Sequence, residues 1–116
     1  MNISKKANIG KNVKISDTAK IFDNVTIEDD VSIEDFCLIG FSLNANPSDR
    51  LVIKKNTKIN SHTIIYQNSH IGNDSVIGHN VLIREKTLIE NNVQIGSFSD
   101  IEGYSNISYS KEPDRA

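Results

Sequence analysis

The sequence predicts a single all-β domain wound as a triangular solenoid, and three observations lead to this prediction. Isoleucine recurs at every sixth residue from Ile3 to Ile39 and again from Ile53 to Ile107, seventeen times in this frame. The residue four positions after each of these is mostly small or modestly apolar, and the positions between are mostly polar. The chain has 116 residues, no Trp and only 6% aromatic residues, which suits a thin interior better than a large globular core.

The six-residue period distinguishes a solenoid from other structures. A helix repeats its apolar face near 3.6 residues and a strand alternates at two, so neither needs a frame of six. In a solenoid each hexad supplies one short strand and one corner, with the isoleucine inside. Polar pairs such as Asp29-Asp30 and Asn91-Asn92 suit corners, where left-handed backbone conformations are needed. Three hexads make one 18-residue coil, so residues 18 apart should stack at the strand spacing of about 4.8 Å.

The frame is interrupted once, because Ile39 and Ile53 are fourteen residues apart. Pro47 and the polar run around it favour a projecting loop, predicted at 41–51. We interpret the interruption as one missing strand replaced by this loop, which gives about six coils. On this count the hexads that begin at residues 3, 21, 39, 59, 77 and 95 share one side of the prism. The repeat is predicted to span 1–108, and the tail 109–116 to be irregular.

All three histidines lie after the interruption, among the hexads between Ile53 and Ile107. On the count above, His62 and His79 occupy stacked corners of one edge beside the loop, whereas His70 lies at another corner. A zinc site needs three or four ligands that converge at about 2 Å. Two stacked histidines do not supply these ligands, so no metal is expected.

Composition excludes other functions. The formal net charge of −2 provides no basic field for nucleic acid. The sequence contains no basic amphipathic helix and no apolar run of membrane-spanning length, so no membrane partner is expected. Cys37 is alone and the first residues lack an apolar leader, which makes the cytoplasm the expected location.

Three strings carry a more specific resemblance: SHTIIY at 61–66, GHNVLIRE at 78–85 and NNVQIGSFSDIEG at 91–103, preceded by DFCLIG and the loop. The tandem hexad pattern, (Ile/Val/Leu)-Gly-x-x-(small/Val)-x, resembles the hexapeptide-repeat superfamily of left-handed parallel β-helices. Within this superfamily the three strings are most similar to the acyltransferases related to nucleotide-amino-sugar N-acetyltransferases. This resemblance implies a left-handed coil, acetyl-CoA as acyl donor, and an amino sugar or sugar nucleotide as acceptor. It also implies a homotrimer with each active site between two subunits.

In similar enzymes a histidine on a coil corner acts as general base, and by motif position this residue is His79. An imidazole with a pKa near 6.5 can accept the proton of an attacking amine or hydroxyl at neutral pH. The expected substrate contacts are His62, Tyr66, Asn80, Arg84 and Glu85, together with Arg50 of the loop, which could meet a nucleotide phosphate.

Two alternatives remain open. The first is a non-catalytic or truncated β-helix scaffold, because similar enzymes continue for several coils beyond the position of Gly103. The second is a zinc enzyme similar to the γ-carbonic anhydrases, in which His70 of a neighbouring subunit would complete the ligand set.

Overall fold

The computed structural model describes residues 2–43 and 48–108 and confirms the all-β fold class. Its described residues form seventeen short strands and no helix. No described segment is therefore a helix long and apolar enough to cross a membrane. The predicted irregular tail at 109–116 and the centre of the predicted loop, 44–47, lie outside the described residues.

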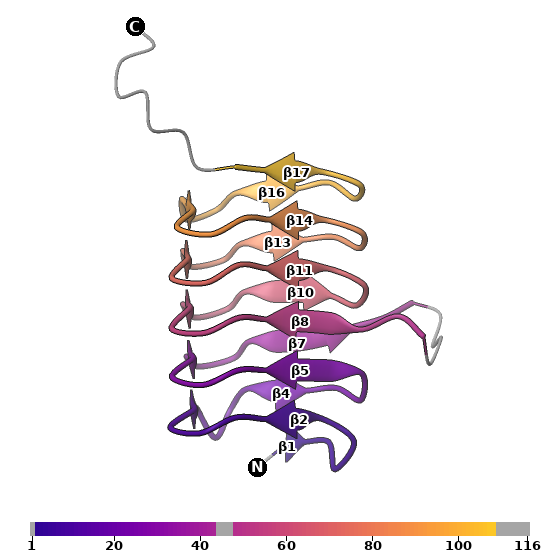
Figure 1. Cartoon of the computed structure of the whole chain (residues 1–116), viewed down its shortest axis with the longest axis vertical. Coiled ribbons are helices and arrows are strands. Elements are labelled where there is room, and N and C mark those ends of the chain that lie inside the picture. The colour runs from indigo at the N-terminus through magenta and orange to yellow at the C-terminus, as the bar shows by residue number, and fades with distance from the viewer. Residues whose placement is uncertain (1, 44–47, 109–116) are drawn as a thin grey trace, which may run out of the picture.

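Three parallel sheets form the faces of the solenoid (Figure 1). Within the described residues, sheets A and B each take one strand from all six coils, and sheet C takes one from each of the first five. Sheet A contains β1 (Asn2–Ile3), β4 (Lys20–Ile21), β7 (Leu38–Phe41), β10 (Ile64–Tyr66), β13 (Leu82–Ile83) and β16 (Asp100–Ile101). Sheet B contains β2 (Asn8–Ile9), β5 (Val25–Ile27), β8 (Leu51–Ile53), β11 (His70–Ile71), β14 (Leu88–Ile89) and β17 (Asn106–Ile107). Sheet C contains β3 (Lys14–Ile15), β6 (Ser32–Ile33), β9 (Lys58–Ile59), β12 (Val76–Ile77) and β15 (Gln94–Ile95).

The chain passes from sheet A to B to C in every coil. We call the corners between the sheets edge AB, edge BC and edge CA, in the order in which the chain meets them. Residues 18 apart pair within each sheet, as Ile65 does with Ile83. This register confirms the predicted coil of three hexads and a solenoid of about six coils. The left hand of the coil stays a prediction from the resemblance.

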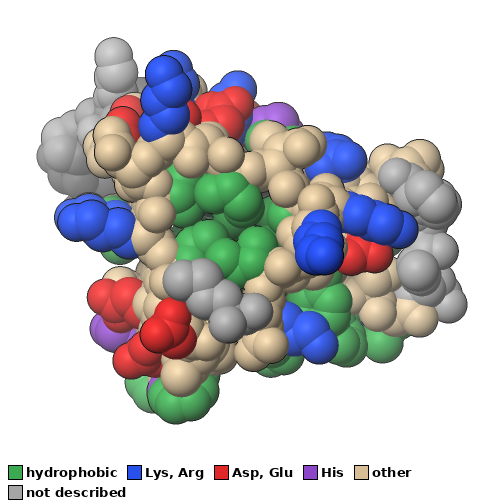
Figure 2. All heavy atoms as spheres, turned by 90° about the horizontal axis from the view of Figure 1, so that it is seen from below, with side chains coloured by type: hydrophobic (Ala, Val, Ile, Leu, Met, Phe, Trp, Pro, Cys, Tyr) green, Lys and Arg blue, Asp and Glu red, His purple; other side chains and the backbone are tan. Residues whose placement is uncertain are grey.

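The interior is a column of isoleucines. Ile39, Ile65 and Ile83 are 0% exposed, as are most of the other framed isoleucines between residues 21 and 89. Viewed from the N-terminal end, hydrophobic side chains fill the centre of the prism, and charged side chains lie around its rim (Figure 2). The predicted thin, isoleucine-rich core is therefore present.

In the later coils, the interior position four residues after a framed isoleucine mostly carries a hydroxyl group. Thr57, Thr63, Ser69 and Ser75 are buried. Each donates a hydrogen bond to a backbone carbonyl fifteen residues further along the chain, over 2.8–3.1 Å. The same oxygens accept backbone N–H groups of the next coil. These internal hydrogen bonds satisfy the buried hydroxyls, which would otherwise destabilise the core.

The interruption contradicts the prediction of a missing strand. β7 in sheet A is followed directly by β8 in sheet B, and Val25 of β5 pairs with Leu51 of β8. Leu51 is 0% exposed and fills the interior position that the six-residue frame assigned to Leu43, which is 69% exposed. The loop is therefore an insertion within edge AB and replaces no strand. Figure 1 shows it projecting sideways between β7 and β8.

This insertion changes the predicted assignment of sides after residue 53. Ile65, Ile83 and Ile101 continue sheet A, whereas the strands that end at Ile59, Ile77 and Ile95 belong to sheet C. The corners after sheet C form edge CA, so the histidine corners and the loop lie on different edges of the prism.

Gly40 allows β7 to enter the loop. Its φ is +91°, and a Cβ atom at this position would lie 2.3 Å from Cγ2 of Val25. The pairing of β7 with β10 shifts here, so that Tyr66 pairs with Phe41. Any side chain at residue 40 would strain the backbone and collide with the core.

Candidate functional site

His79 lies on edge CA in a stack of polar corners. Ser61, His79 and Ser97 are 18 residues apart and occupy equivalent positions in successive coils. The Oγ atom of Ser61 and Nδ1 of His79 form a hydrogen bond of 2.9 Å. The backbone N–H of His79 donates to Oγ of Ser97, also at 2.9 Å. The imidazole is therefore exposed, and one of its nitrogens, Nδ1, is hydrogen-bonded to the protein.

The backbone around His79 is fixed by neighbouring coils. Gly78 donates to the carbonyl of Ile95 and Asn80 donates to the carbonyl of Ser61, both over 2.9 Å. A Cβ atom on Gly78 would lie 2.6 Å from the backbone nitrogen of Ser97. Coils therefore pack too closely here for a larger residue, and both N–H groups flanking His79 already have acceptors.

His62 lies on the same edge as His79, one coil nearer the N-terminus, as predicted. Its φ is +61°, and its ring lies against that of Phe36, with centroids 5.1 Å apart. Its backbone N–H donates to the carbonyl of Asp35. Hydroxyl groups of Ser16 and Thr18 donate to the Asp35 carboxylate and hold its pKa below the ordinary value.

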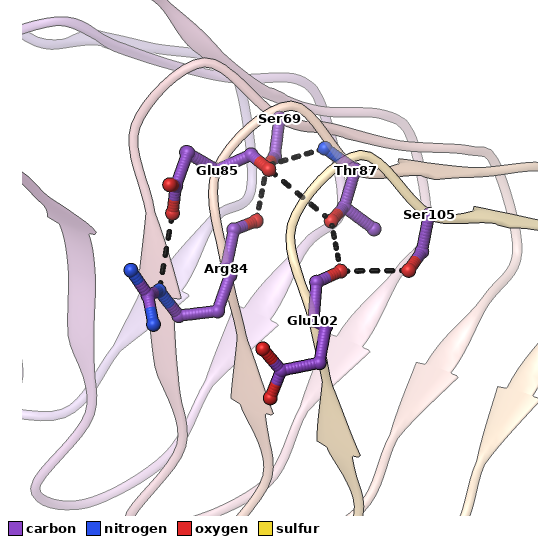
Figure 3. A network of polar contacts seen from close by, with 6 residues as sticks. All are labelled: Ser69, Arg84, Glu85, Thr87, Glu102 and Ser105. Carbon is purple, nitrogen blue, oxygen red and sulfur yellow. Dashed lines mark hydrogen bonds and ion pairs between the residues drawn. The ribbon is translucent and has the colours of Figure 1, made fainter.

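Tyr66, Arg84 and Glu85 come together at edge AB, away from His79. The guanidinium of Arg84 lies 4.7 Å from the centre of the Tyr66 ring, and its Nε donates to Oε1 of Glu85 at 3.1 Å. Figure 3 shows this pair beside the backbone carbonyls of Arg84, Glu85 and Glu102, which accept hydrogen bonds from the hydroxyls of Ser69, Thr87 and Ser105. The Glu85 pKa is lowered, first by a hydrogen bond from its own backbone N–H and then by Arg84.

A cavity of about 140 Å³ lies beside these residues, where the loop leaves the prism. We call it the loop pocket; its lining residues are Phe41, Ser42, Leu43, Asp49, Tyr66, Gln67, Asn68, Glu85 and Lys86. The ring of Tyr66 meets that of Phe41 edge to face, with centroids 5.2 Å apart. The prediction that the edge of His62 and His79 lies beside the loop is therefore wrong, because His79 is on edge CA and the loop is on edge AB.

Arg50 and His70 lie together beside the returning end of the loop. Both line a shallow depression over sheet B, and Nη1 of Arg50 donates to Oγ1 of Thr26 at 3.1 Å. Desolvation, and then the charge of Lys54, lower the pKa of His70. Within the described residues, no group of three or more His, Cys, Asp or Glu side chains could hold a metal ion.

One comparison with known proteins agrees with the repeat. Residues 51–85, which run from β8 to the corner after β13, match the family described as bacterial transferase hexapeptide (six repeats). The matched segment contains all three histidines and spans 35 of the 116 residues. The match supports the predicted resemblance to the hexapeptide-repeat superfamily and a scaffold of the transferase class. No curated protein matches the chain.

Several residues of these sites were not predicted from the sequence. Ser61 and Ser97 lie 18 residues before and after His79, so the coil length alone could have identified them as its neighbours. Asp49 and Gln67 carried no such signal. Their placement in the loop pocket depends on the path of the insertion, which the hexad frame does not contain.

Proposed function

We propose that the protein is an acyl-CoA-dependent acyltransferase that acetylates an amino group of an amino sugar or sugar nucleotide, with His79 as general base. The hydrogen bond between Ser61 and His79 is the observation that carries this proposal. When Nδ1–H of His79 donates to the Ser61 hydroxyl, Nε2 keeps its lone pair and can accept a proton. An exposed imidazole held in one orientation on a rigid corner is suited to general base catalysis.

The chemistry requires one proton acceptor. The acceptor amine attacks the thioester carbonyl of acetyl-CoA and transfers its proton to Nε2 of His79. The carbon–sulfur bond then breaks, and the thiolate of CoA leaves and takes a proton. The donor and acceptor are both substrates, so the chain itself supplies orientation and the base.

The protein is further proposed to act as a homotrimer. The base lies on edge CA and the predicted acceptor contacts Tyr66 and Arg84 lie on edge AB. The interface of a cyclic trimer is heterologous, so it places one surface of a subunit against a different surface of its neighbour. Edge CA of one subunit can thereby face edge AB of the next, which would complete a site that one chain leaves divided.

Release of CoA thiol from acetyl-CoA with a panel of amino sugars tests the proposal. Replacement of His79 by Ala is expected to lower kcat by about 10²–10⁴-fold, the usual contribution of a general base. The control is His70→Ala, because His70 lies on another face and should leave turnover unchanged. Full activity of His79→Ala would exclude this residue as the base.

A further inference from the structure

The loop pocket contains hydrogen-bond acceptors that have no partner. Gln67 is 7% exposed, and its buried Oε1 has no hydrogen-bond partner. Asp49 is half-buried, and within the described residues its carboxylate takes part in no ion pair or hydrogen bond. Glu85 uses Oε1 to accept from Arg84. The pocket therefore contains two acceptors, Gln67 Oε1 and the Asp49 carboxylate, that no described donor satisfies.

The walls of the pocket also favour a cation. Phe41 and Tyr66 line it with aromatic rings, whose faces attract positive charge, and the Arg84 guanidinium already lies over the Tyr66 ring. Among the described lining residues, Lys86 is the one with a cationic side chain, and its Nζ lies 5.1 Å from the centre of the Tyr104 ring. Its ammonium group is thus already placed against another aromatic ring in the following coil.

The ligand's chemistry follows from these groups. A primary ammonium group has three N–H donors and a positive charge, which suit Gln67 Oε1 and the carboxylates of Asp49 and Glu85. The terminal torsion of a glutamine side chain is broad, so a small rotation can turn Oε1 toward a ligand. A cavity of about 150 Å³ accommodates benzene, so a volume of about 140 Å³ suits a ligand body of about that size.

We propose that the loop pocket binds the primary ammonium group of a small organic cation with a ring-sized apolar body. The pocket shares Tyr66 and Glu85 with the acceptor contacts expected from the sequence, but binding of the ammonium group needs neither His79 nor acetyl-CoA. Neighbouring carboxylates stabilise the charged form of an amine, whereas attack on a thioester requires the neutral form. The bound ammonium group is therefore recognised and not acylated in this pocket.

Cyclohexylamine is a suitable probe, and cyclohexanol is its neutral counterpart of equal size. Backbone amide NMR signals of Tyr66, Gln67 and Asn68 report binding without any turnover. Cyclohexylamine is expected to shift these signals with a Kd in about the millimolar range, reasonable for seven non-hydrogen atoms. Cyclohexanol is expected to bind at least about tenfold more weakly, because it lacks the charge.

Two variants test the residues. Asp49→Asn should weaken cyclohexylamine binding by about tenfold, while Asp17→Asn, an exposed carboxylate on edge CA, should leave it unchanged. Gln67→Glu adds a carboxylate at the unpartnered acceptor and should tighten binding. The Gln67→Glu variant still tests the proposal if Asp49→Asn does not fold.

Three results would overturn the proposal. The first is absence of shifts at these signals with cyclohexylamine. The second is equal binding of cyclohexylamine and cyclohexanol, which would indicate that the pocket recognises only the apolar ring. The third is weaker binding in Gln67→Glu. Because binding is measured without acetyl-CoA, loss of the proposed transferase activity would not produce any of these results.

Discussion

The third residue after most framed isoleucines lies at a corner and has a positive φ. In the described part of the chain, twelve such residues have φ between +54° and +65°. Seven of them are Asn or Asp, which tolerate this conformation, as the polar corner pairs predicted. The other five have larger side chains, and they are Phe36, His62, Lys86, Phe98 and Tyr104. These five lie on edges CA and AB, the two edges that carry the candidate sites.

Phe98 should be replaceable by Asn with a gain in stability. Its side chain is 79% exposed, so few contacts are lost, and a non-glycine residue other than Asn or Asp is strained at positive φ. Phe98→Asn is expected to raise the free energy of unfolding by about 0.5–1 kcal/mol, as measured by urea denaturation. The reciprocal change Asn92→Phe, on edge BC, should lower it. A less stable Phe98→Asn protein would show that this ring makes contacts that outweigh its backbone strain.

At the level of strands and corners, hydroxyl groups link one coil to the next. Thr63 Oγ1 donates to the carbonyl of Gly78 at 2.9 Å and accepts the N–H of Val81 at 3.3 Å. Parallel strands of only two or three residues offer few ladder hydrogen bonds per sheet. These buried side-chain bonds therefore add a second set of contacts along the axis, immediately inside the His79 corner.

Thr63→Val should destabilise the solenoid although it keeps the shape of the side chain. It leaves a buried carbonyl and a buried N–H without partners, which costs about 1–3 kcal/mol. The measurement is the free energy of unfolding in urea. Thr63→Ser, the matched control, keeps the hydroxyl and loses one methyl group, at about 0.8 kcal/mol. Equal stability of Thr63→Val and the unmodified protein would mean that the hydrogen bonds contribute nothing net.

For the whole molecule, the division of candidate residues between two edges is the main consequence of the loop. His79 stands on edge CA, whereas Arg84 and Tyr66 stand on edge AB. Within one chain these groups face different directions from the prism. An active site that uses both requires two copies of the chain.

Mixed oligomers test this arrangement. His79→Ala and Arg84→Gln are each expected to be nearly inactive alone, whereas co-assembly in equal amounts should restore about one quarter of the wild-type activity. This fraction follows from random mixing, in which one interface in four joins an intact His79 to an intact Arg84. Thiol release by the co-expressed variants is the measurement, and each variant assembled only with itself is the control. Activity no greater than the mean of the two variants would contradict the shared site.

The sequence by itself determined the local rules of this protein. A six-residue isoleucine frame requires one strand and one corner per hexad, so it predicted the parallel sheets, the 18-residue register, the interior and the stacking of His62 below His79. These features depend only on contacts between neighbouring repeats, and the spacing of the repeats can be read directly from the sequence.

Only the tertiary structure decided which sheet each strand after the interruption joins. Fourteen residues between Ile39 and Ile53 fit either a missing strand or an insertion in one corner. Pairing of Val25 with Leu51 selects the insertion, because it buries Leu51 and keeps β5 and β8 hydrogen-bonded. That choice moved the loop to edge AB and created the loop pocket. It depends on strand pairing between residues 26 apart, which no local periodicity specifies.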